Sequence, residues 1–525
     1  MGDARLWTGG RIFTGKRYAE ALLVDGGEVV AAGTESAVRR MAPTGTEAIP
    51  LEGRLMLPGL IDAHLHLSDL ARFRSGLDLT EVRGPDDLEH RVRTWVEGHP
   101  GGSVVGRGLD VERSLAGHWP TRSDLDRMTS DRPLVLVHSS GHAAILNSVA
   151  LTIGEGDSRP PGELEGRIGR APDGRPNGIV YEEAVRWFTS RIPARLEPDE
   201  LLRTLDLLAS FGLTSVATMN VAPEELVELR SLASDGRFPI RVRVYLRLLR
   251  IREFRPADLS PVGMDGSFAV VGTKGFTDGA FGPRTAWLSE PYTDMPDGSG
   301  LAVESDDTLA DALSAGHALG LAPALHAIGD RAVVRAARLI RPYARRQGAA
   351  ARIEHAALTP PSALVALDDV RPALVVQPGF VWSDSWLPQR LGAARVRWAY
   401  AFRTLTDRGH LLVGSSDAPY DPPDPWRGLR AVVERRDPLG RSANPDPHEA
   451  LTYEEATRMY GCNAGVALGE SALGSLEPGS RADLIVLDTK TLGEAIRLGA
   501  RTVRETWVGG RRFSAAGEAA SGRSP

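Results

Sequence analysis

The chain has 525 residues, a formal net charge of −6 and a single cysteine. This length is enough for one large domain and at least one smaller unit. A nearly balanced charge without a long run of one sign disfavours nucleic acid and anionic membranes as partners. One cysteine excludes an intramolecular disulfide and a cysteine-cluster zinc site. The first residues lack a signal peptide, and no apolar run reaches the length of a membrane helix, so we expect a soluble cytoplasmic protein.

Both ends of the chain carry short β-prone pieces. Residues 5–56 alternate such pieces with glycine turns, which is typical of a small antiparallel sheet. Similar β-prone pieces with glycine turns occur again between about 474 and 513. The glycine-, alanine- and serine-rich residues 516–525 are predicted to be a disordered tail.

The run Leu57–His66 ends an apolar stretch in two histidines, His64 and His66. Side chains at positions i and i+2 of a strand point to the same face, so both imidazoles can aim at one point. Two converging imidazoles can bind a divalent transition metal. Alone the pair is a weak signal, because this spacing also arises on solvated strands by chance.

More than a hundred residues then separate the first predicted barrel strand from the second. Residues 68–191 contain the segment Ser139-Ser-Gly-His142-Ala-Ala-Ile-Leu-Asn147 and a Gly-, Pro- and Arg-rich stretch at 157–178. This segment is too long for a simple connection between two strands of an α/β barrel, the fold that the remaining strands predict. It is predicted to be an insertion that folds over the mouth of that barrel.

Strand-like runs alternate with helical patterns over the rest of the chain, as a parallel α/β fold requires. The eight predicted strands are Leu57–His66, Thr214–Met219, Arg241–Leu248, Phe268–Lys274, Ala322–His326, Arg352–His355, Leu374–Gln377 and Leu411–Asp417. Eight such strands fit a (β/α)8 TIM barrel, whose active-site residues lie at the C-terminal ends of the strands. Every candidate ligand falls at such an end. They are His64, His66, Lys274, His326, His355 and Asp417.

Several sequence motifs around these residues resemble those of the metal-dependent amidohydrolase superfamily, in particular its amidohydrolase family 3, or YtcJ-like, branch. They are Lys274-Gly-Phe-Thr-Asp-Gly-Ala-Phe-Gly-Pro-Arg-Thr-Ala, His326-Ala-Ile-Gly-Asp-Arg-Ala, Arg352-Ile-Glu-His355 and Gly414-Ser-Ser-Asp417-Ala-Pro. The resemblance extends from about residue 5 to about 515. It implies a β-sandwich built from residues 1–56 and 466–515 that flanks a barrel over residues 57–465.

The resemblance also implies one or two metal ions held by these six side chains. Taken singly, each histidine could be a hydrogen-bonded core residue, and Asp417 could be a helix cap. Zinc is the default metal, although manganese, iron and nickel accept the same ligands. Lys274 could remain an ammonium group. If burial and metal charge lower its pKa, it could instead add carbon dioxide and bridge two metals as a carbamate.

The expected reaction is hydrolysis of an amide, N-acyl or N-formyl C–N bond of a small molecule by metal-activated hydroxide. Asp417 would accept the proton of the water and pass it to the leaving group. An ester, lactone or carbamate hydrolase is the alternative. A deaminase is less favoured, because Gly329 stands where related deaminases carry a glutamate, and a non-catalytic binding protein is the least favoured.

Three further residues are candidates for substrate contact. His142 would reach the site from the insertion or lie at the surface. Arg284 could recognise a carboxylate or pair with Asp278. Trp382 could form an aromatic pocket wall or take part in ordinary packing. The assembly remains open between a monomer and a homodimer.

Overall fold

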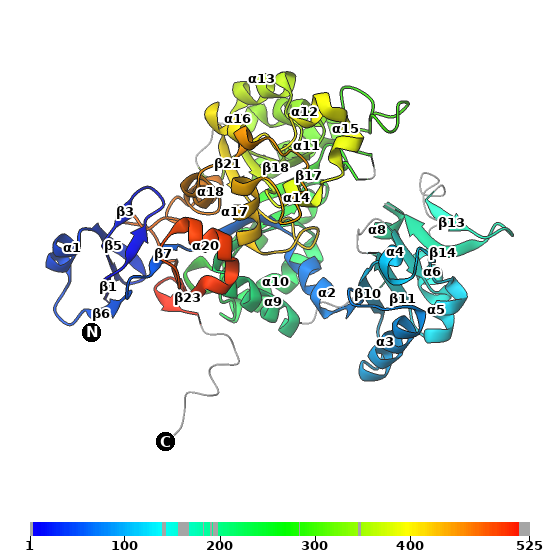
Figure 1. Cartoon of the computed structure of the whole chain (residues 1–525), viewed down its shortest axis with the longest axis horizontal. Coiled ribbons are helices and arrows are strands. Elements are labelled where there is room, and N and C mark those ends of the chain that lie inside the picture. The colour runs from blue at the N-terminus through cyan, green and yellow to red at the C-terminus, as the bar shows by residue number, and fades with distance from the viewer. Residues whose placement is uncertain are drawn as a thin grey trace. The chain divides into compact units, whose positions relative to one another are not determined.

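The computed structural model describes residues 4–138, 143–155, 167–181, 183–189, 192, 198–282, 284–344 and 348–513. Its central element is an eight-stranded parallel sheet, drawn in Figure 1 among the green and yellow helices. In sheet order the strands are β8 (Leu60–Leu65), β15 (Leu213–Val221), β16 (Arg241–Arg247), β17 (Phe268–Phe276), β18 (Ala322–Ala327), β19 (Arg352–His355), β20 (Ala373–Val376) and β21 (Leu411–Gly414). This confirms the predicted (β/α)8 barrel.

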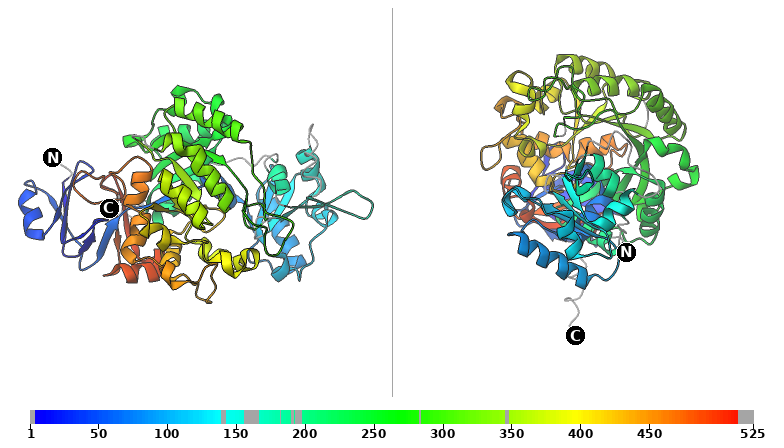
Figure 2. Two further views of the ribbon diagram at one scale, coloured as in Figure 1. Left: turned by 90° about the horizontal axis from the view of Figure 1, so that it is seen from above. Right: turned by 90° about the vertical axis from the view of Figure 1, so that its right-hand side faces the viewer.

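Helices follow the strands and cover the sheet, and the right-hand view of Figure 2 shows the green to yellow ones curving around it. The α-helices are α9 (Pro198–Ser210), α10 (Pro223–Ser234), α11 (Asp306–Ala318), α12 (Asp330–Ile340), α13 (Pro361–Val370), α14 (Phe380–Ser383), α15 (Leu387–Val396), α16 (Phe402–Asp407), α17 (Pro425–Glu434), α18 (Tyr453–Met459), α19 (Cys462–Ala467) and α20 (Leu492–Leu498). Short 3-10 helices are η1 (Leu248–Glu253), η2 (Pro256–Leu259), η3 (Met264–Gly266), η4 (Arg341–Tyr343), η5 (Pro447–Glu449) and η6 (Gly499–Thr502).

The first and last barrel strands meet at their C-terminal ends. The amide of Asp417 donates to the carbonyl of His64, and the amide of His66 donates to the carbonyl of Ala418, each over 2.8 Å. Below this point Asp62 Oδ1 accepts the amides of His64 and Ser416, each at 3.1 Å. These bonds close the barrel and hold the ends of β8 and β21 side by side.

The predicted first strand is in fact two strands. β7 (Leu55–Pro58) belongs to another sheet, and β8 starts only after Gly59. A Cβ built on Gly59 would lie 2.2 Å from Thr214 Oγ1, so the close approach of β15 leaves no room for a side chain there. The chain therefore passes from one sheet to the next through a glycine.

Two sheets from both ends of the chain share one hydrophobic core. One has the order β5-β4-β1-β6 and the other the order β24-β23-β22-β7-β2-β3. The bounds of their strands and of helix α1 are β1 (Arg5–Thr8), β2 (Arg11–Phe13), β3 (Tyr18–Ala19), β4 (Ala21–Asp25), β5 (Glu28–Gly33), α1 (Glu35–Met41), β6 (Glu47–Pro50), β22 (Leu484–Leu487), β23 (Val503–Val508) and β24 (Arg511–Arg512). Trp7 and Trp507 meet edge to face in this core, with ring centroids 5.3 Å apart.

A buried ion pair joins this sandwich to the barrel. Arg241, the first residue of β16, donates from Nε and Nη2 to the carboxylate of Asp483 at 2.8 and 3.2 Å. Both side chains are almost completely inaccessible to solvent. Such a bidentate contact fixes orientation as well as proximity, and it anchors the N-terminal end of the barrel, opposite the candidate site.

Residues Ser68–Thr204 form a second compact unit. Its sheet has the order β13-β14-β12-β11-β10-β9 and mixes parallel with antiparallel pairs. The elements are α2 (Leu67–Ser75), β9 (Leu77–Asp78), α3 (Pro85–Gly98), β10 (Val104–Leu109), α4 (Val111–Ser114), α5 (Arg122–Met128), β11 (Leu134–His138), β12 (Ala143–Leu146), α6 (Ser148–Glu155), β13 (Ile168–Arg170), β14 (Pro176–Tyr181) and α8 (Glu183–Thr189). That this unit covers the barrel mouth stays a prediction.

Among the described residues, no helix has the length and apolar character needed to cross a membrane. The predicted disordered tail, 516–525, lies outside the described residues.

Candidate metal centre

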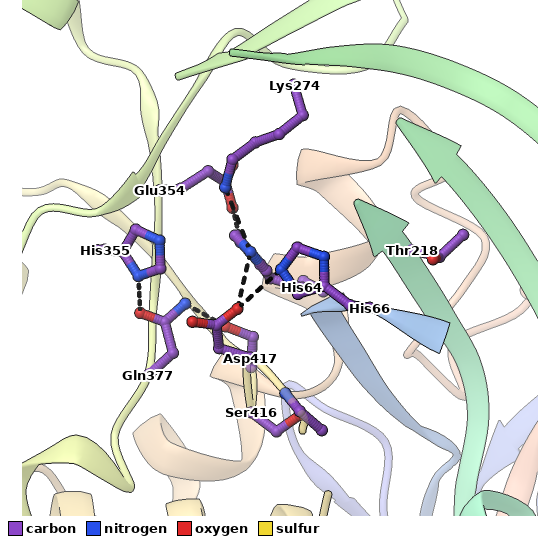
Figure 3. Close-up of polar contacts among 12 residues, drawn as sticks. His64, His66, Thr218, Lys274, Glu354, His355, Gln377, Ser416 and Asp417 are labelled. Carbon is purple, nitrogen blue, oxygen red and sulfur yellow. Dashed lines mark hydrogen bonds and ion pairs between the residues drawn. The ribbon is translucent and has the colours of Figure 1, made fainter. Parts of the chain in front are cut away.

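Three side chains from three barrel strands bring ligand atoms together at the C-terminal end of the sheet. His64 lies on β8, His355 ends β19, and Asp417 follows β21, and their ligand atoms all lie within 4.8 Å of one another. Figure 3 shows the three converging. All three are buried. A nitrogen, nitrogen and carboxylate set of this kind suits a divalent transition metal.

The other three predicted ligands lie around this group. His66 Nε2 is 3.3 Å from Asp417 Oδ1, and Lys274 Nζ is 3.3 Å from His64 Nε2. The ring of His326 packs against that of His355, with centroids 4.4 Å apart. The structure therefore brings all six predicted side chains into one cluster.

A buried carboxylate fixes the proton on His64. Glu354 Oε2 lies 2.5 Å from His64 Nδ1, and Arg352 donates to both oxygens of Glu354 at 2.8 Å. Burial alone would raise the pKa of Glu354, but Arg352 and His64 hold it well below its usual value. An ionised Glu354 accepts the Nδ1 proton of His64, so Nε2 offers its lone pair to the cluster.

An amide fixes the proton on His355 in the same way. Ser415 Oγ donates to the carbonyl of Val376 and accepts from Gln377 Nε2, which turns Gln377 Oε1 toward His355. That oxygen lies 2.7 Å from His355 Nδ1. Burial lowers the pKa of His355 to about 3, so its ring is neutral at pH 7. Its Nε2 lone pair then faces the cluster.

His326 is held through its other nitrogen. Its Nε2 donates to the carbonyl of Gly279 over 2.9 Å, which leaves the lone pair on Nδ1. Burial holds the pKa of His326 well below its usual value, so the ring is neutral. Asp278 fixes the Gly279 segment, because its carboxylate accepts the amides of Ile328 and Gly329 at 3.0 and 2.8 Å.

Burial and neighbouring groups also shift the pKa values of the charged groups of the cluster. Burial lowers the pKa of Lys274 to about 8, because an ammonium group is poorly solvated there. Burial alone would raise the pKa of Asp417, but His64 and His66 hold it well below its usual value. Asp417 is therefore an ionised acceptor at neutral pH, beside a lysine that gives up its proton more readily than usual.

Two members of the cluster have strained backbones. His355 has φ of 73° and Asp417 has φ of 61°, both in the left-handed region. Non-glycine residues in this region are uncommon and often occur at functional sites. Here the conformation turns each side chain inward just where its strand ends.

Sequence reasoning did not assign Glu354, Gln377 or Asp62. Glu354 and Arg352 lie two residues apart on a short apolar strand, and two charges on one strand face are a recognisable signal of a buried pair. Gln377 gives no comparable signal. Its role depends on the chain fold that brings β20 beside β19.

The structure describes the surroundings of two of the three predicted substrate-contact residues. Arg284 pairs with Asp294 at 2.8 Å and not with Asp278. Trp382 is buried, and Arg427 lies 5.2 Å from its ring. Neither residue has a described contact with the six clustered side chains, so their substrate roles stay predictions. His142 lies outside the described residues.

The chain matches the model of a family described as "Amidohydrolase family" over residues 47–513. It is 29% identical to the putative amidohydrolase YtcJ of Bacillus subtilis (strain 168), over 92% of this chain and 94% of that protein. It is 28% identical to the N-substituted formamide deformylase of Arthrobacter pascens, over 90% of each chain. An uncharacterized metal-dependent hydrolase from Pyrococcus horikoshii OT3 has a similar structure, with a TM-score of 0.80 and 28% identity, over 93% of this chain and 97% of that one.

We expect His355→Ala to lose most of the bound metal, because removal of one ligand leaves an ion poorly held. Metal content of the purified protein, measured by plasma mass spectrometry, checks this. His448→Ala is the matched control, since His448 is exposed and far along the chain from every cluster residue. Full metal content in the His355 variant would contradict the assignment of this ligand.

Proposed function

The chain belongs to the amidohydrolase family, and we propose that, as a metal-dependent hydrolase of C–N bonds, it acts on small N-formyl or N-acyl amines. The observation that carries the proposal is the convergence of His64, His355 and Asp417 at the C-terminal end of the barrel. The formamide deformylase, similar over 90% of this chain, supports the N-formyl class.

The polar atoms of the cluster fit a metal ion. His64 Nε2 and Asp417 Oδ1 lie 3.2 Å apart, and with Nδ1 protonated both atoms present lone pairs. Asp417 Oδ1 is buried, and its near neighbours within the described part of the chain are the ring nitrogens of His64 and His66, at 3.2 and 3.3 Å. Closely spaced nitrogen and carboxylate lone pairs are stabilised by a cation that both can bind. A metal ion would satisfy both atoms together with His355.

We propose zinc as this metal, in one or two ions. Neutral imidazole and carboxylate ligands suit zinc, and a second ion would take His326 and His66 as further ligands. Lys274, whose pKa burial lowers to about 8, would carry a carbamate in the two-metal form. The neutral amine is the form that adds carbon dioxide, and its proximity to His64 would place the carbamate at the metals.

The bound metal would activate a water and polarise the scissile carbonyl. Asp417 acts as the general base, because it is ionised at neutral pH and belongs to the same cluster. It then delivers the proton to the leaving nitrogen. Glu354 and Gln377 hold the two histidines in the tautomers that this arrangement requires.

The position of Gly329 argues against deamination. A Cβ built there would lie 2.1 Å from the carbonyl oxygen of Trp287, so no side chain fits without a shift of the backbone. The glutamate that related deaminases place at this point has no room. An ester, lactone or carbamate hydrolase remains the second candidate, because the same centre would attack any activated carbonyl.

We expect the zinc-loaded protein to hydrolyse N-formylphenethylamine, a neutral formamide. Treatment with a chelator should abolish turnover and added zinc should restore it, because the metal supplies the nucleophile. Amine release measured by chromatography checks this, with phenethyl formate as the matched ester. Rapid cleavage of the ester without cleavage of the formamide would favour the second candidate.

We expect Lys274→Ala to lose most activity and part of the metal, since the carbamate that would help to hold the ions could no longer form. Acetate or propionate should restore some activity by occupying the vacated space. The comparison is Lys490→Ala, because Lys490 is exposed. Unchanged metal content and activity in Lys274→Ala would show that no carbamate is needed.

We expect Asp417→Asn to keep at least one metal ion and to bind substrate, but to turn over about 10²-fold more slowly or worse. An amide keeps the shape of the side chain but is not a useful base near neutral pH. Steady-state kinetics and metal analysis on the same sample check this. Turnover within a few-fold of the wild type would assign the proton transfer to another group.

A further inference from the structure

Alternate residues of β16 line the inside of the barrel. Arg243 donates to Glu470, and Tyr245 stacks on the guanidinium of Arg352 at 4.4 Å. The pairing of β16 with each neighbouring strand shifts by one residue. The extra residue lies in β15 on one side and in β17 on the other, so β16 itself has no bulge. Because strand side chains alternate, Arg247 points to the same face as Tyr245.

Arg247 therefore lies at the C-terminal end of the barrel, on the side of the metal centre. It is the last residue of β16, and its Cα is in register with that of Lys274 on β17. Residues in register on parallel strands share a face. Lys274 Nζ reaches His64 Nε2, so this face is the one that lines the candidate site.

The guanidinium of Arg247 has no side-chain hydrogen bond to a described residue, and its charge acts on the carboxylates of Glu224 and Glu253, whose pKa values it helps to lower. Its Nε is buried and donates no hydrogen bond to a described residue, and the side chain is partly buried overall. The nearby carboxylates of Glu224 and Glu253 are both bound by Arg250, at 2.6 to 2.9 Å. These two carboxylates balance the charge of Arg247 but leave its buried Nε–H without an acceptor, and a ligand oxygen would satisfy it.

We propose that Arg247 binds a carboxylate of the substrate, so that the enzyme acts on N-formyl or N-acyl amines that carry a carboxylate near the scissile bond. This rests on the proposed function and narrows its substrate class. An arginine fork matches a carboxylate with two parallel hydrogen bonds. Phe276, whose ring packs against His326, offers an apolar surface at the candidate site.

The test compares N-formylphenylalanine with N-formylphenethylamine, which differ only in the carboxylate. We expect the wild type to prefer the first, and Arg247→Gln to lower this preference in kcat/KM by about 10- to 100-fold, mainly through KM. Arg247→Lys should keep part of the preference. Turnover of the neutral compound should change by less than about 3-fold, since its transition state makes no ionic contact with Arg247.

Arg252→Gln is the matched control, because Arg252 lies five residues further along and pairs with Asp311, which is not one of the carboxylates next to Arg247. A preference that is unchanged in Arg247→Gln, or lowered equally in Arg252→Gln, would overturn the inference. The affinity of the Asp417→Asn protein for each compound, measured by calorimetry, tests the role of Arg247 separately from the proposed hydrolysis. If neither formamide is hydrolysed, the proposed function fails, and equal affinity for both compounds would independently overturn the role of Arg247.

Discussion

Closure of the barrel between its first and last strands is the constraint on which the candidate centre depends. The strand ends are joined by amide bonds from Asp417 to His64 and from His66 to Ala418, and the buried carboxylate of Asp62 binds both strands just below. The same residues that close the barrel carry the ligands. A change in register here would move His64 and Asp417 apart, so the fold and the site are set by one set of hydrogen bonds.

The centre also depends on the buried ion pair between Arg352 and Glu354. Loss of either partner would leave an uncompensated charge in the interior. Arg352 neutralises Glu354, its Nη2 is further bound by the carbonyl of Ala63, and Glu354 in turn orients His64. In a low-dielectric interior these bonds are strong, and an unpaired member would be correspondingly costly. The consequence is a rigid histidine whose free nitrogen and direction are determined before any metal binds.

The sequence predicted those features that follow from local pattern. The barrel strands are short apolar runs, and a polar residue at the end of each run indicates a ligand, so His64, His326, His355 and Asp417 could be found. Features that depend on long-range pairing were missed or assigned wrongly. Gln377 acquires its role only because β20 lies beside β19, and Asp294, the partner of Arg284, follows it in a loop without any periodic pattern. The break between β7 and β8 depends on the approach of Thr214, 155 positions beyond Gly59, which no local signal reveals.

The crowded backbone around Gly329 also bears on how protons move. A side chain at this position could donate a proton to a leaving nitrogen, but the carbonyl of Trp287 fills the space that its Cβ would need. The amide of Gly329 is at the same time held by Asp278, which ties the segment down. His326 and His355 are neutral, and each directs its ring N–H to a fixed acceptor, Gly279 or Gln377, so neither has a proton free to give. Of the clustered carboxylates, Glu354 is committed to Arg352 and His64, so Asp417 is the carboxylate that the proposed mechanism can use as a base.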